Sequence, residues 1–131
     1  KSIKSPNDFY DVVFDIMSAI TFISDDNERK QYFSEISRVL KPGGHYYFLC
    51  ARKEGVFHDV FEDSLLLQKG CIKRKLDGML EKVYTEDELI RSFPNFENLK
   101  LQIVSEHTRA FGDEKFIREE GFWFGDFKKK K

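Results

Sequence analysis

The sequence predicts an α/β fold with a partial, mostly parallel sheet, and two observations carry this prediction. Between residues 10 and 50 a strand-like run, a capped helix, a glycine turn and a second strand-like run follow one another. This is the order of a βαβ unit, whose two strands are parallel and connected in the right-handed sense. Between residues 85 and 127 a second helix and two more strand-like runs follow. We expect the last strand to return antiparallel at the C-terminal end.

The first strand is expected at residues 10–16, which read YDVVFDI. β-Branched and aromatic residues make up most of this run, and the turn-forming segment SPND at 5–8 precedes it. An apolar run of this kind is typical of a strand in a parallel sheet that is covered on both sides. The sequence therefore predicts a strand that is buried on both faces.

The helix that follows has clear start and stop signals. Asp25 can cap its first turn, and Glu28, three residues on, can reach back to the amide of the cap. The apolar residues at three-to-four-residue spacing, which form one stripe, are Tyr32, Phe33, Ile36, Val39 and Leu40. The segment KPGG at 41–44 ends the helix with two glycines that tolerate positive φ angles. The second strand, YYFLC, is expected at 46–50.

The middle of the chain, residues 51–84, is less regular. Apolar residues at helical spacing, which predict a helical stripe, are Phe57, Val60, Phe61 and Leu65. Asp77 and Gly78 lie between two strand-like runs and are a two-residue hairpin signal.

A second capping box opens the C-terminal part of the chain. Thr85 and Glu88 predict a short helix, which should end before Pro94. Residues 99–104 alternate like a strand, and residues 122–127, FWFGDF, form an aromatic strand with a glycine interruption. The charged connection at about 107–120 is expected to be a loop.

Composition excludes several classes of function. The 131 residues carry a formal net charge of -1, which gives no electrostatic reason to expect nucleic acid or an anionic membrane as a partner. Cys50 and Cys71 form no C-x-x-C pair and the three histidines are scattered, so neither a metal site nor a disulfide framework is predicted. No apolar run approaches the roughly 20 residues of a membrane-spanning helix. We therefore expect one soluble, cytoplasmic domain.

Two segments of the βαβ unit resemble a known family. Residues 9–15, FYDVVFD, resemble the fourth strand of class I S-adenosylmethionine-dependent methyltransferases, and residues 38–44, RVLKPGG, resemble the turn from helix to fifth strand. The two strings lie about 25 residues apart with a capped helix between them, so spacing, element type and turn chemistry agree. The later elements are similar to the family's sixth and seventh strands, with the seventh antiparallel between the fifth and sixth. The resemblance implies a partial Rossmann-like methyltransferase sheet.

The resemblance also implies that much of the cofactor site is absent from this sequence. The family places S-adenosylmethionine on a glycine-rich turn after its first strand, with an acidic residue at the end of the second strand. No G-x-G-x-G occurs in the chain. We therefore expect residues 1–131 to be the C-terminal half of a methyltransferase domain, with 51–84 as a variable, substrate-cap-like insertion. Such a fragment alone should be inactive and bind the cofactor weakly or not at all.

The resemblance places the cofactor's methionine moiety at the end of the first strand. The implied cofactor-binding residues are Asp15, Ile16, Met17 and Ser18. In the alternative interpretation Asp15 only fixes the turn from strand to helix, as Asp often does.

The implied contacts to a small-molecule acceptor follow at Phe22, Arg52, Phe57 and His58. The alternative interpretation is that Phe22 is a packing residue and His58 a solvated one. Many relatives carry a His where this chain has Thr21 and Phe22, so no catalytic residue is assigned. Methyl transfer is an in-line displacement, and alignment of donor and acceptor supplies much of its rate.

An unpaired edge of the first strand would favour association with another strand. The expected partner is the missing N-terminal half or, in a homodimer, a second copy of the chain. Two other functions stay open: a non-enzymatic, methyltransferase-like interaction module, and a different α/β binding domain in which the KPGG turn is a coincidence.

Overall fold

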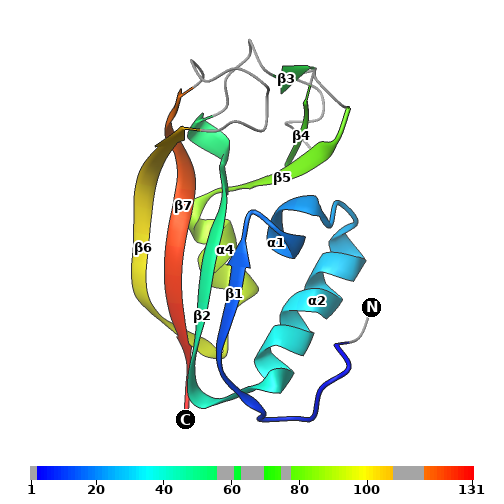
Figure 1. Cartoon of the computed structure of the whole chain (residues 1–131), viewed down its shortest axis with the longest axis vertical. Helices are drawn as coiled ribbons and strands as arrows, with labels where there is room; N and C mark the ends of the chain where they lie inside the picture. Colours follow the sequence, from blue (N-terminus) through cyan, green and yellow to red (C-terminus); the bar gives the residue numbers. More distant parts are fainter. Residues whose placement is uncertain (1–2, 56–60, 63–69, 75–77, 108–116) are drawn as a thin grey trace.

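The computed structural model describes residues 3–55, 61–62, 70–74, 78–107 and 117–131 (Figure 1). Its elements are β1 (Tyr10–Ile16), α1 (Ala19–Phe22), α2 (Asp26–Val39), β2 (Leu40–Arg52), the 3-10 turn η1 (Lys53–Gly55), β3 (Phe61–Glu62), β4 (Cys71–Arg74), β5 (Leu80–Tyr84), α4 (Glu86–Ser92), β6 (Phe96–His107) and β7 (Ile117–Lys129). Within these residues seven strands form one sheet, in which β2 pairs with β1, β5 and β7. The predicted α/β fold is confirmed.

The N-terminal βαβ unit forms as predicted, with one correction: Leu40, predicted in the helical stripe, and the segment 41–44, predicted as a turn, already belong to β2. β1 and β2 are parallel, with Val13 opposite Tyr46 and Asp15 opposite Phe48. The Asp25 side chain accepts a hydrogen bond of 2.9 Å from the amide of Glu28 and so caps α2. This cap is local, which is why the sequence alone locates the start of the helix.

The two glycines that follow α2 serve different purposes. Gly43 has a φ angle of +83° and occupies the left-handed region that was expected for both residues. Gly44 does not: a Cβ atom there would lie 3.0 Å from the carbonyl oxygen of Asp11 and 2.9 Å from that of Lys41. The second glycine is needed for close approach of two backbone segments rather than for its φ angle.

The C-terminal strands have the expected order. β7 is antiparallel to both β2 and β6 and lies between them. Thr85 caps α4, which ends at Ser92, before Pro94. The glycine interruption in β7 has a steric cause, because a Cβ atom on Gly125 would lie 2.1 Å from the Phe48 ring. That ring packs where a side chain would otherwise stand.

The middle of the chain agrees with the sequence only in part. β4 and β5 are antiparallel, with Ile72 opposite Glu81, so the two strands pair as predicted. Their register does not fit the predicted two-residue turn at Asp77 and Gly78, which would place Lys73 opposite Lys82. The ladder closes at Lys73 and Leu80. The predicted helical stripe is wrong at Phe61, which lies in β3, and its other residues lie outside the described part of the chain.

The helices lie on one side of the sheet, and the core lies between them and the strands (Figure 1). Tyr46, Phe48 and Trp123 point toward this side and are buried. On the other side Phe14 is 70% exposed and Ile16 is 49% exposed. The prediction that β1 is buried on both faces is therefore wrong for this chain, because no helix among the described residues covers the second face.

The described residues contain neither a long apolar helix nor a cluster of metal-binding side chains. No helix in the described ranges is long and apolar enough to cross a membrane. The same ranges hold no group of three or more His, Cys, Asp and Glu side chains that could bind a metal ion. Cys50 and Cys71 are free thiols, and both are buried.

Gly125→Ala should destabilise the fold by about 2 kcal/mol, because the added methyl group would overlap the Phe48 ring, which is enclosed by core side chains. Urea denaturation monitored by circular dichroism measures this change. Gln102→Ala, at an exposed position of the neighbouring strand β6, is the control and should change the free energy of unfolding by less than about 0.5 kcal/mol. Equal effects of the two substitutions would show that the Phe48–Gly125 contact does not matter.

Candidate functional site

The candidate cofactor-binding residues lie where the chain leaves the carboxyl end of β1. The amide of Met17 donates a hydrogen bond of 2.8 Å to the carbonyl of Leu49, which is the last contact of β1 with β2. Met17 then adopts a φ angle of 49°, in the left-handed region that non-glycine residues seldom occupy. This bend costs about 1 kcal/mol and places Ser18 at the exposed edge of the sheet.

Asp15 is buried, with 1% of its surface exposed. Its carboxylate accepts hydrogen bonds from the hydroxyl of Tyr32 at 2.7 Å, the hydroxyl of Tyr46 at 2.8 Å and the amide of Ile20 at 3.0 Å. These contacts tie β1 to α1, α2 and β2. They favour the interpretation in which Asp15 fixes the turn from strand to helix. Its direct contact with a cofactor stays a prediction.

Burial and the nearby carboxylate keep the two tyrosines protonated. Desolvation raises the pKa of Tyr32 and of Tyr46 above the ordinary value, and the negative charge of Asp15 raises both further. Both hydroxyl groups therefore remain hydrogen-bond donors at neutral pH. Sequence reasoning missed this cluster. The parallel register carries the signal, because Tyr46 and Phe48, two residues apart on β2, share a face with Asp15.

Tyr84 is a second residue that sequence reasoning missed. Its hydroxyl donates a hydrogen bond of 2.6 Å to the carbonyl of Ile20, and its own carbonyl accepts one of 3.0 Å from the Trp123 indole. Desolvation raises the pKa of Tyr84 well above the ordinary value. The Tyr84 side chain therefore fastens α1 to β5, and the Tyr84 backbone carbonyl joins β5 to the Trp123 side chain of β7.

Of the four predicted acceptor-binding residues, the structure describes Phe22 and Arg52. Phe22 ends α1 and is 38% exposed. Arg52 ends β2, its guanidinium carbon lies 5.4 Å from the centre of the Trp123 ring, and it donates a hydrogen bond of 3.1 Å to the carbonyl of Glu120. Because β1 and β2 are parallel, Arg52 belongs to the edge at which Ser18 lies, whereas this pairing does not place Phe22. Phe57 and His58 are outside the described residues.

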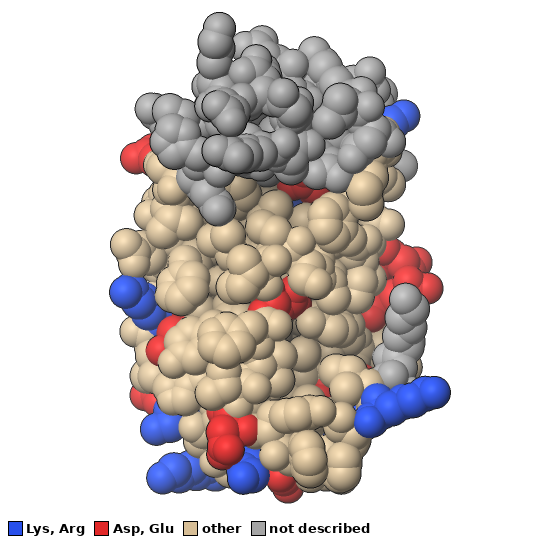
Figure 2. Space-filling view, in the orientation of Figure 1, with Lys and Arg blue, Asp and Glu red and all other residues tan. Residues whose placement is uncertain are grey.

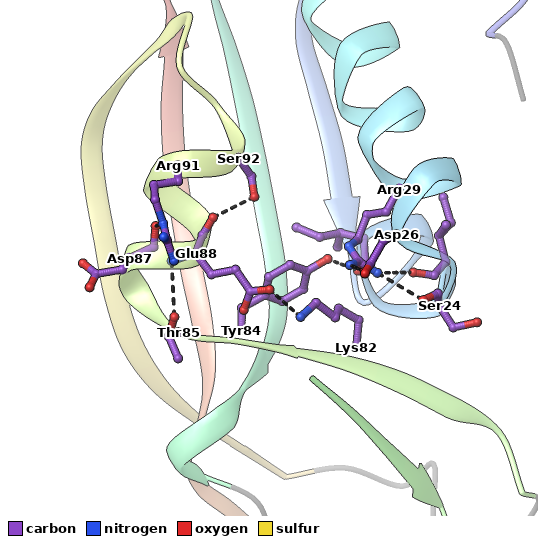
Figure 3. A network of polar contacts seen from close by, with 12 residues as sticks. Ser24, Asp26, Arg29, Lys82, Tyr84, Thr85, Asp87, Glu88, Arg91 and Ser92 are labelled. Atoms are coloured by element: carbon purple, nitrogen blue, oxygen red, sulfur yellow. Dashed lines mark hydrogen bonds and ion pairs between the residues drawn. The ribbon is translucent and has the colours of Figure 1, made fainter. Parts of the chain in front are cut away.

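A network of charged side chains supports this edge from the helix side (Figure 3). Lys82 on β5 pairs with Glu88 on α4 at 2.5 Å, and Lys82 is only 3% exposed. Arg29 on α2 pairs with Asp26 and donates a hydrogen bond of 3.0 Å to the carbonyl of Ile23. The contacts of Arg29 hold the segment between α1 and α2 in place, and the pair of Lys82 and Glu88 joins β5 to α4.

A groove of about 930 Å³ separates α2 from α4 on the helix side of the sheet. Its floor includes Phe33 and Phe93, and Arg29 and Arg91 are among its lining residues. None of the predicted site residues lines it. The groove is therefore a feature separate from the candidate site.

Asp15→Ala should lower the free energy of unfolding by about 3 kcal/mol, because three donors would lose their acceptor inside the protein. Tyr32→Phe removes a single hydrogen bond and should lower it by about 1 kcal/mol. Urea denaturation of both variants measures the difference. A loss for Asp15→Ala no larger than that for Tyr32→Phe would contradict the arrangement described.

The raised tyrosine pKa values predict that stability falls in alkaline solution. An unfolded chain releases each tyrosine proton near pH 10, whereas buried Tyr46 retains its proton. The free energy of unfolding should therefore fall by about 1.4 kcal/mol per pH unit for each such group as the pH rises above about 10. Tyr46→Phe should show a shallower slope than the wild type between pH 10 and 12.

Comparison with known proteins gives a family match for part of the chain. The model of the methyltransferase domain family matches residues 2–48, which include β1, α2 and the turn into β2. No curated protein matches the sequence.

Solved structures match nearly the whole chain. A SAM-dependent methyltransferase from Methanosarcina mazei has a TM-score of 0.76 and 20% identity over 98% of this chain and 63% of its own. The 1,6-didemethyltoxoflavin-N1-methyltransferase of Burkholderia thailandensis, solved with S-adenosylhomocysteine, has a TM-score of 0.62 and 13% identity over 97% of this chain and 47% of its own. The [4+2]-cyclase SpnF has a TM-score of 0.60 and 17% identity over 98% of this chain and 53% of its own.

At these identities the solved structures show the fold, and this chain spans about half to two thirds of their length. The matched segment at residues 2–48 adds the sequence pattern of the methyltransferase domain. Together they confirm the predicted resemblance: the chain has the partial Rossmann-like fold of a class I S-adenosylmethionine-dependent methyltransferase.

Proposed function

We propose that this chain forms part of an enzyme that transfers a methyl group from S-adenosylmethionine to a small-molecule acceptor. The observation that carries the proposal is the bend at Met17, which places Ser18 at the carboxyl edge of two parallel strands. In open α/β sheets ligands bind outside this edge, where the strand order reverses. The methyltransferase fold and the family match support the same ligand.

The residues present fit one end of the cofactor. Ser18 is exposed and its side chain does not cap α1, so its hydroxyl group is available to a ligand. Backbone atoms of Ile16 and Met17 line the same edge. Asp15 contributes as a positioning residue, since its carboxylate already accepts three hydrogen bonds. No turn with the glycine-rich pattern occurs in the sequence, so the phosphate-loop equivalent must come from another segment.

The chemistry requires alignment more than proton transfer. S-Adenosylmethionine supplies a sulfonium methyl group, which an acceptor atom attacks in line while the sulfur leaves as a neutral thioether. In this proposal Phe22 and Arg52 contact the acceptor, Phe22 as an apolar wall and Arg52 as a cation at the end of β2. No residue is assigned as general base. Free, buried cysteines agree with the reducing cytoplasm as the location.

The chain alone should bind the cofactor weakly and show no turnover. A thermal-shift titration with 1 mM S-adenosylhomocysteine should therefore raise its melting temperature by about 2 °C at most, because a ligand at or below its dissociation constant stabilises little. The Methanosarcina mazei methyltransferase, titrated in the same way, is the positive control. A shift of about 10 °C in this chain would show that it holds a complete cofactor site.

The alternative function is a non-enzymatic, methyltransferase-like interaction module. One observation favours it: on the side of the sheet without helices Phe14 is 70% exposed and Ile16 is 49% exposed, and apolar exposure of this kind marks an interaction surface. The likeness to SpnF, named a [4+2]-cyclase, adds that the fold does not fix the reaction. A radiolabelled methyl-transfer assay against amine, hydroxyl, thiol and carbon acceptors separates the enzyme from the interaction module. It is carried out with the chain together with the segment that supplies the rest of the cofactor site. Cofactor binding without any turnover would support the interaction module.

A further inference from the structure

The groove between α2 and α4 has the size of a small-molecule site. Its volume of about 930 Å³ lies within the range of roughly 300–1,000 Å³ that is usual for ligand pockets. Both helices that form its walls contribute to the hydrophobic core, α2 through Phe33 and Ile36 and α4 through Leu89. The groove is therefore held open by the packing of this chain itself.

Aromatic rings form the floor of the groove. The rings of Phe33 and Phe93 lie 4.5 Å apart, and Phe96 packs edge-on against Phe93 at 5.5 Å. Phe93 also stacks on Phe48 at 6.2 Å, so the core fixes the position of the floor. Each of the three floor rings is at most 7% exposed, which makes the floor narrow. A narrow, rigid, apolar floor suits a flat ligand, because binding then orders few protein side chains.

Hydrogen-bond donors line the wall that α2 forms. Lys30, Ser34 and Ser37 follow one another at spacings of four and three residues, which places them along one face of the helix. None of these three side chains makes a hydrogen bond or an ion pair in the described part of the chain. This wall therefore offers an ammonium group and two hydroxyl groups to a ligand.

The carboxylates that line the groove are already neutralised. Asp26 pairs with Arg29, and Glu88 pairs at 2.5 Å with Lys82, which reaches it from β5 (Figure 3). A carboxylate that is paired with a cation repels an approaching anion much less than a free one does. The acidic residues of the groove therefore do not exclude an anionic ligand.

Two cations in the groove have no carboxylate partner. Arg91 on α4 donates from Nε to the carbonyl of Asp87 at 3.3 Å, and it forms no ion pair with a described carboxylate. Lys30 is exposed on the opposite wall. The lining cations that are already engaged in ion pairs are Arg29, Arg38 and Lys129. The charge that a ligand meets in the groove is therefore positive on both walls.

The other side of the sheet offers no comparable charge. Figure 1 shows β2 and β7 in front of α4, so Figure 2, in the same orientation, shows the side away from this helix. Uncharged side chains cover most of that view, and Lys and Arg lie toward its margins. An apolar ligand has two surfaces to choose from on this chain, whereas an anionic one is attracted to the groove.

We propose that the groove between α2 and α4 binds a small aromatic anion. Its ring lies on Phe33 and Phe93, and its anionic group accepts charge-assisted hydrogen bonds from Lys30 on one wall and Arg91 on the other. None of the predicted cofactor-binding or acceptor-binding residues lines the groove, so this ligand is neither the cofactor nor the methyl acceptor. The inference goes beyond the proposed function and does not depend on it.

The test compares two probes that differ in charge and share one ring system. 2-Naphthoate is the anionic probe, and 2-naphthamide is its neutral counterpart. Each is titrated into the complete chain labelled with nitrogen-15, at low ionic strength, and amide signals are followed by nuclear magnetic resonance. 2-Naphthoate should bind with a dissociation constant of about 1 mM or lower, at least about tenfold below that of 2-naphthamide. The amides that shift should be those of Phe33, Ser34, Ser92 and Phe93.

Three variants make the result specific. Lys30→Gln and Arg91→Gln should each weaken the binding of 2-naphthoate about fivefold and leave that of 2-naphthamide unchanged. Lys100→Gln is the matched control, because Lys100 is exposed on β6 and lies outside the groove, and its loss removes the same charge. This control should keep the wild-type affinity. All three positions are exposed, and circular dichroism checks that each variant still folds.

Four outcomes would overturn the proposal. Equal dissociation constants for the two probes would show that the groove does not recognise charge. Shifts confined to Val12, Phe14 and Ile16 would show that the ring binds the opposite side of the sheet. An equal loss of affinity in Lys100→Gln would reduce the effect to the overall charge of the chain. Shifts that do not saturate up to about 10 mM would show that the groove has no such ligand. None of these outcomes bears on binding of S-adenosylhomocysteine, so the two proposals fail separately.

Discussion

The carboxylate of Asp15 is the interaction on which the rest of the structure depends. It accepts hydrogen bonds from α1, α2 and β2, while its own backbone belongs to β1. A buried carboxylate is tolerated only when donors surround it. Tyr46, one of these donors, also stacks on Phe48 at 5.3 Å, so the polar cluster and the aromatic core share a side chain. The edge at Met17 is therefore held by the core of the protein and not by a loop.

The same core explains why the two sides of the sheet differ. On the helix side close packing leaves no room for a side chain at Gly125, because the Phe48 ring fills that position. On the other side Phe14 stacks on Tyr47 but is still 70% exposed. The packed helix side of the sheet contains the hydrophobic core of the chain. The open side has the composition of an interior surface, which is the physical basis for expecting a partner.

Local sequence signals predicted most of the helices and strands. Contacts between residues far apart in the sequence could not be predicted in this way. The caps at Asp25 and Thr85 depend on neighbours three residues away, so the sequence located both helices. The two tyrosine partners of Asp15 lie 17 and 31 residues away, and their contact follows from strand register, which the sequence does not state directly. The burial of β1 was wrongly predicted for a related reason. An apolar run shows that a strand is suited to a covered face, but not that the cover is present.

The polar groups at the candidate edge would suit a cationic ligand, and they offer no free group for acid–base catalysis. Tyr32 and Tyr46 are committed to Asp15, and the Thr21 hydroxyl is buried and contacts the Met17 sulfur at 3.6 Å. The negative charge of Asp15 reaches further, since after burial it is the next cause that raises the pKa of Cys50 on β2. A buried negative charge whose oxygens already accept three hydrogen bonds attracts a positive group without offering it a base. This is the electrostatic environment that a sulfonium ion would favour, and it agrees with a reaction that depends on alignment.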